Sequence, residues 1–130
     1  MERKFHLLKG TLQVLLENGE APREIVGVLS DAARLARERN LQNLLVLSGV
    51  DDPMTAEAAS TAVDEIHACG VPPPLRIAFV ACMLPQYDAY RFAARHAETL
   101  GILAKVTGSA YDAKRWLGLH EHERACALEQ

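Results

Sequence analysis

The sequence predicts a single α/β domain with a mixed, mostly parallel sheet of about five strands, about four helices and an N-terminal β-hairpin. Apolar runs of strand length alternate with longer stretches of helical periodicity, which indicates strand–helix–strand units with right-handed crossovers. Two of the runs, residues 44–47 and 77–81, are continuously apolar, as in strands buried on both faces. With 130 residues and 49% hydrophobic content, the chain is long enough for one domain with its own core.

The first elements are two short strands, at residues 5–9 and 11–17, joined by a turn at Lys9-Gly10. Glycine suits this turn because it readily takes a positive φ. A helix then begins at Pro22, where proline is tolerated and the nearby Glu24 complements the helix dipole. Asn40 is expected to end the helix in a left-handed conformation. The buried stripe at helical spacing comprises Ile25, Val28, Leu29, Ala32, Leu35 and Ala36.

The central strand is predicted at residues 41–47, and a second helix follows it. This helix begins either at Asp52, as an N-cap before Pro53, or at Thr55, and it ends at Gly70. A second buried strand is expected at residues 75–83.

The last part of the domain contains a third helix from Pro85 to Gly101, a strand at residues 102–106 and a final helix at residues 109–117. Ser109 and Asp112 resemble a capping pair for that final helix. We assign residues 1–119 to the domain and residues 120–130 to a charged C-terminal extension. The inward face of the third helix is predicted to be Ala89, Phe92, Ala93, His96, Ala97 and Leu100.

Composition argues against several classes of function. A net charge of −3 and 5% aromatic residues provide neither a basic face nor a stacking platform for nucleic acid. No apolar run is long enough for a membrane span, and no apolar segment follows the charged N-terminus as in an export signal. The three cysteines, Cys69, Cys82 and Cys126, form no Cys-x-x-Cys pair. We therefore expect a cytoplasmic protein without disulfides or cofactors.

Small and polar residues gather directly after the central strand. Open α/β sheets usually bind ligands and partners at the carboxyl ends of their strands. The sequence therefore predicts a binding or interaction surface at this position, made of Ser48, Gly49, Asp51, Asp52 and Thr55.

Several short motifs carry a resemblance to a known family. They are the hairpin opening, Ser48-Gly49-Val50 after the central strand, Leu75-Arg76-Ile77-Ala78-Phe79-Val80, Arg91-Phe92-Ala93 before Gly101-Ile102, and Asp112-Ala113 with Trp116-Leu117 in the last helix. Together with the order of elements, they make the chain similar to the SpoIIAA-like superfamily, which includes the STAS domains of anti-sigma factor antagonists. The resemblance implies a SpoIIAA/STAS-like fold and a regulatory module that binds a protein partner.

The resemblance also implies a phosphoacceptor. In the antagonists, a kinase phosphorylates the first serine of Asp-Ser-[Ser/Ala]-Gly at the start of the second helix. Counted from Ser48-Gly49-Val50, that serine corresponds to Thr55, and Met54 takes the place of the aspartate. A threonine at a helix start also serves as a simple N-cap, so both interpretations of Thr55 are open.

Our leading prediction is a regulatory or protein-interaction module without catalytic activity. One alternative is a small apolar or lipid-like ligand beneath the alanine-rich helix at residues 56–68, as in a related family of lipid-binding domains. Another is a thiol enzyme that uses Cys82 at the end of a buried strand. His120, His122 and Cys126 include metal-ligand types but lack a second cluster, which favours a solvated segment. Self-association is also expected, through free hairpin or sheet edges or through the exposed residues of the alanine-rich helix.

Overall fold

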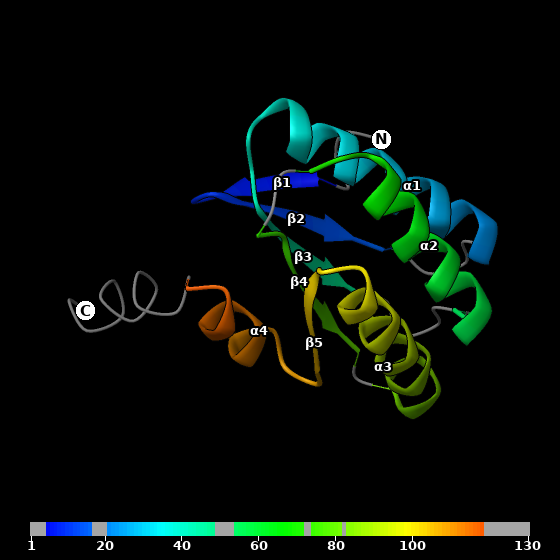
Figure 1. The fold of residues 1–130 in the computed structure, drawn as a ribbon. Helices are drawn as coiled ribbons and strands as arrows, with labels where there is room; N and C mark the ends of the chain where they lie inside the picture. The colour runs from blue at the N-terminus through cyan, green and yellow to red at the C-terminus, as the bar shows by residue number, and fades with distance from the viewer. Residues whose placement is uncertain (1–4, 17–20, 49–53, 72–73, 82, 119–130) are drawn as a thin grey trace, which may run out of the picture.

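The computed structural model describes residues 5–16, 21–48, 54–71, 74–81 and 83–118, and Figure 1 shows its fold. Five strands and four helices are present in these ranges, so the predicted α/β class is confirmed. In chain order the elements are β1 (Phe5–Leu8), β2 (Thr11–Leu15), α1 (Pro22–Glu38), β3 (Asn43–Leu47), α2 (Ala56–Ala68), β4 (Arg76–Val80), α3 (Leu84–Thr99), β5 (Leu103–Thr107) and α4 (Ala110–Trp116).

The strands form one sheet in which spatial order follows chain order, β1-β2-β3-β4-β5. The hairpin pair β1 and β2 is antiparallel, and every later pair is parallel. A sheet with this order has no point at which successive crossovers change direction. It therefore lacks the strand-order reversal that opens a ligand crevice in doubly wound folds.

The helices are distributed unevenly over the two faces of the sheet. Because each right-handed crossover moves to the next strand in the same direction, α1, α2 and α3 all lie on one face. Figure 1 shows these three helices side by side on that face, with α4 on the opposite one. Among the described residues, helix covers the second face only near β3, β4 and β5, where α4 packs.

The two faces accordingly have cores of different size. The larger core lies between the sheet and α1, α2 and α3, and in it the rings of Phe79 and Tyr90 stack with centroids 4.8 Å apart. The smaller core, beneath α4, consists of Leu45, Ala78, Val80, Ala113 and Leu117.

The inward face predicted for α3 was wrong at one large residue. Phe92 is 57% exposed, whereas Tyr90, which was not predicted to face inward, is fully buried against Phe79. The physical reason is which side of α3 packs against α2 and β5. Its buried stripe runs through Ala89, Ala93 and Ala97 at a spacing of four residues. This stripe turns Phe92 toward solvent.

Most predicted element ends are close to the observed ones. Asn40 has a φ of 58° and Gly10 a φ of 66°, so both take the left-handed conformation that ends α1 and turns the first hairpin. The central strand starts two residues later than predicted. The N–H of Leu41 donates to the carbonyl of Ala36 at 2.8 Å, so Leu41 still belongs to the end of α1.

In the part of the chain that the structure describes, no helix combines the length and apolar character that crossing a membrane requires.

Candidate functional site

The loop after β3, where the sequence predicts a binding surface, is only partly described. Ser48 follows β3 directly, and its N–H donates to the carbonyl of Val80 at 2.9 Å, which holds the end of β3 against β4. Gly49, Asp51 and Asp52 lie outside the described residues. Thr55 is described, so the structure defines the two ends of the predicted surface.

Thr55 is the N-cap of α2. Its backbone is extended, with φ −108° and ψ 161°, and its Oγ1 accepts a hydrogen bond from the N–H of Ala58 at 3.1 Å. Its carbonyl accepts the first intrahelical bond, from Ala59, at 2.9 Å. Of the two predicted starts of this helix, the one at Thr55 is therefore confirmed. The side chain is exposed, and the preceding Met54 is buried in the core.

Thr55 also lines a groove on the outer surface between α1 and α2. One part of the groove, of about 480 Å³, adjoins Thr55 and Arg23. A second part, of about 550 Å³, continues toward Cys69. The two parts share Thr61 and Glu65, so they form one continuous feature, which we call the α1–α2 groove.

The walls of the α1–α2 groove carry opposite charges, with basic residues on α1 and acidic residues on α2. Both sets of residues lie on the solvent-facing sides of the two amphipathic helices, which meet along one line. The basic residues are Arg23, Arg34 and Arg37, and the acidic ones are Glu57, Asp64 and Glu65.

Hydrogen bonds join the two helices at the far end of this groove. Arg37 Nη1 donates to the carbonyl of Cys69 at 3.1 Å, and Cys69 Sγ contacts the carbonyl of Ser30 at 3.7 Å. Cys69 is a partly buried free thiol. These contacts fix the spacing of α1 and α2 where α2 ends.

On the other flank of α2, His96 contacts Asp64 of that helix. Its Nε2 lies 2.6 Å from Asp64 Oδ1, and the histidine side chain is 34% exposed. His96 is thus a half-buried, hydrogen-bonded residue that joins α3 to α2.

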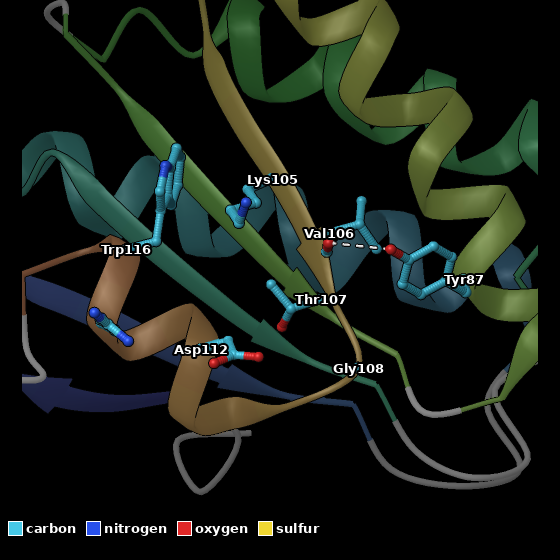
Figure 2. Close-up of a pocket in the computed structure, with 8 residues that line it drawn as sticks. Tyr87, Lys105, Val106, Thr107, Gly108, Asp112 and Trp116 are labelled. Atoms are coloured by element: carbon cyan, nitrogen blue, oxygen red, sulfur yellow. Dashed lines mark hydrogen bonds between the residues drawn. The ribbon is translucent and has the colours of Figure 1, made fainter.

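A second groove, which sequence reasoning missed, lies along β5 between α3 and α4. Its volume is about 630 Å³. Figure 2 shows Tyr87 of α3 on one side of it and Asp112 and Trp116 of α4 on the other. The one feature of the sequence that pointed to this groove is Lys105, a charged residue inside a short apolar strand.

The space beneath α2 bears on the alternative of a small apolar ligand. The inward side chains of this helix, Ala59, Ala62, Val63 and Ile66, are all at most 2% exposed and belong to the main core. The alanines bring α2 close to the sheet. The grooves described above lie outside this packed layer.

Within the described ranges, no group of three or more histidine, cysteine, aspartate or glutamate residues is placed to hold a metal ion. Four residues weighed for thiol or metal chemistry, Cys82, His120, His122 and Cys126, lie outside those ranges.

No family model, curated protein or solved structure matched this chain. The resemblance to the SpoIIAA-like superfamily therefore stays a prediction from the sequence.

Proposed function

We propose that this protein is a non-catalytic regulatory module that binds a protein partner through the α1–α2 groove and the adjoining start of α2. The single observation that carries the proposal is the position of Thr55. Its exposed side chain caps α2 and lines the same groove as Arg23. A surface-accessible hydroxyl is thus combined with a helix N-terminus and a nearby cation.

The charges of the groove indicate what kind of partner would fit. Arg34 and Asp64 are already paired, with Asp31 and His96 respectively. Arg23 and Arg37 on α1 and the glutamates on α2 are the other charges of the groove, so a complementary segment carries acidic residues along one edge and basic residues along the other. Between the walls, Val26, Ala58 and Ala68 offer small apolar contacts. A short amphipathic helix of the partner has this arrangement of side chains.

The regulatory part of the proposal concerns phosphorylation of Thr55, the position that the SpoIIAA-like resemblance implies. A phosphate there would add close to two negative charges at the N-terminus of α2, where the helix dipole favours them. It would also partly neutralise the basic end of the groove at Arg23. Phosphorylation would therefore change which partner segments the groove accepts.

We also propose that the protein is cytoplasmic. The support is an odd number of cysteines without a Cys-x-x-Cys pair, one of which, Cys69, is a free thiol.

The test compares binding by variants that differ at one charge. Arg23→Glu reverses a charge in the groove and leaves the fold intact, since an acid in the first turn of α1 suits the helix dipole. Arg95→Glu makes the same change on the exposed surface of α3 and is the matched control. Proteins retained by immobilised wild type are identified by mass spectrometry, and the affinity of each purified candidate is then measured by calorimetry.

We expect Arg23→Glu to lower the affinity for the partner about tenfold or more and Arg95→Glu to leave this affinity unchanged. Thr55→Asp retains an N-cap and adds a charge, and it should also alter the affinity, whereas Thr55→Ser should not. Equal binding by wild type, Arg23→Glu and Thr55→Asp would refute the proposed location.

A further inference from the structure

The strand β5 is an edge of the sheet. It pairs with β4 on one side, and no other described strand pairs with it on the other. On the side of β4, the N–H of Leu103 donates to the carbonyl of Leu75 at 3.0 Å, and the carbonyl of Thr107 accepts from the N–H of Ala81 at 2.9 Å. Because backbone groups of successive strand residues point to alternate sides, the N–H and C=O groups of Ala104 and Val106 face outward from the sheet.

One of these outward groups already has a contact. The hydroxyl of Tyr87 donates to the carbonyl of Val106 at 3.5 Å, a long hydrogen bond that Figure 2 shows as a dashed line. The remaining outward groups are the N–H of Val106 and both backbone groups of Ala104. Ala104 and Val106 are only partly buried, and Val106 lines the groove along β5.

The groove along β5 has two chemically different sides. On the side of α4 it is lined by the cations Lys105 and Arg115, the carboxylate of Asp112 and the indole of Trp116. On the side of α3 it is lined by Tyr87 and Val106. Positive charge exceeds negative charge, and it is confined to one face of the strand.

This charge pattern argues against a second copy of the chain as the occupant. Two copies that paired their β5 strands antiparallel, across a two-fold axis, would place both Lys105 side chains on the same face of the shared sheet. Both Arg115 side chains would lie beside them, and like charges on paired strands are destabilising. A lysine on an edge strand is a common means of preventing such self-pairing.

We propose that β5 binds an acidic peptide segment of a partner protein, in extended conformation, as a sixth strand. The main chain of the peptide would pair with the outward groups of Ala104 and Val106. Since its side chains alternate between the faces, acidic residues would reach Lys105 and Arg115, and the intervening apolar residues would contact Tyr87. This surface is separate from the α1–α2 groove.

The experiment uses a short, capped peptide of alternating glutamate and valine as the probe. Binding is followed by the fluorescence of Trp116, the only tryptophan of the chain, and by NMR shifts of the Ala104 and Val106 amides. Two peptides are compared with it: one with lysine in place of glutamate, and one with N-methylated amides on the edge that would pair with β5.

We expect saturable binding of the glutamate peptide, with the largest amide shifts at Ala104 and Val106. The lysine peptide and the N-methylated peptide should each bind about tenfold more weakly or worse. Lys105→Glu should weaken binding of the glutamate peptide to a similar extent and strengthen binding of the lysine peptide. Lys9→Glu, the same change in the hairpin turn beside β1, should change neither.

Three results would overturn the proposal. The first is the absence of both fluorescence change and amide shifts at millimolar peptide. The second is equal binding of the N-methylated peptide, which would indicate a charge contact without strand pairing. The third is a wild-type dimer, detected by native mass spectrometry, whose formation prevents the glutamate peptide from binding. Arg23→Glu should bind the probe as wild type does, so failure here is distinguishable from failure of the α1–α2 groove.

Discussion

The guanidinium of Arg76, on β4, lies over the indole of Trp116, with its central carbon 5.9 Å from the ring centroid. The same side chain donates to the carbonyls of Trp116 and Leu117, each at 3.4 Å, and to Asn43 Oδ1 at 3.2 Å. A cation thus meets the last carbonyls of α4, where the helix dipole favours positive charge. Arg76 therefore anchors the C-terminal end of α4 to the sheet.

Replacing Arg76 by lysine keeps the charge but removes the planar fork of donors. We expect Arg76→Lys to lower the free energy of unfolding by about 1–2 kcal/mol, since it weakens both the stacking and the hydrogen bonds. The emission of Trp116 should shift to longer wavelength as the indole becomes hydrated. Urea denaturation and fluorescence measure the two effects. Arg91→Lys, an exposed change on α3, is the control, and an identical response from the two variants would contradict the anchoring role.

The capping role of Thr55 can be measured against a second threonine in the same helix. Thr55→Ala removes the acceptor for the Ala58 N–H and should cost about 1 kcal/mol. Thr61 instead donates to the carbonyl of Glu57 within α2, so Thr61→Ala should be neutral or slightly stabilising. Thermal and urea unfolding compare the two. A loss at Thr61 as large as that at Thr55 would show that the effect does not come from the cap.

Two phenylalanines with opposite environments test the packing of α3. Phe79 is 1% exposed and stacks on Tyr90, so Phe79→Ala should destabilise the protein by about 3–5 kcal/mol. Phe92 lies at the surface, and Phe92→Ala should change stability by no more than about 0.5 kcal/mol. Chemical denaturation gives both values. A large loss for Phe92→Ala would mean that α3 is rotated relative to the arrangement described.

The packing beneath α2 bears on the alternative of a small apolar ligand. Ala62 is 2% exposed, and Ala62→Leu adds volume to a filled layer, which should cost about 1–3 kcal/mol. Ala68→Leu, at the exposed end of the same helix, should cost no more than about 0.5 kcal/mol. Unfolding experiments compare the two variants. If Ala62→Leu were tolerated as well as Ala68→Leu, space for a ligand would exist under α2.

Boundaries set by local chemistry could be predicted from the sequence alone. Asn40 ends α1, Thr55 was one of two predicted starts of α2, and Ser109 caps α4 by accepting from the N–H of Asp112 at 3.3 Å. Each of these depends on a side chain and on backbone within a few residues of it. The sequence carries that information directly.

The alternation of buried strands and amphipathic helices likewise determined the α/β class and the antiparallel start of the sheet. Only the tertiary structure decided that strand order follows chain order, that α4 packs on the second face at β3, β4 and β5, and that Tyr90 rather than Phe92 is buried. The grooves beside Thr55 and along β5 also depend on residues far apart in the chain. Hydrophobic periodicity shows which face of an element is buried, but the neighbour that buries it is fixed by packing across the whole domain.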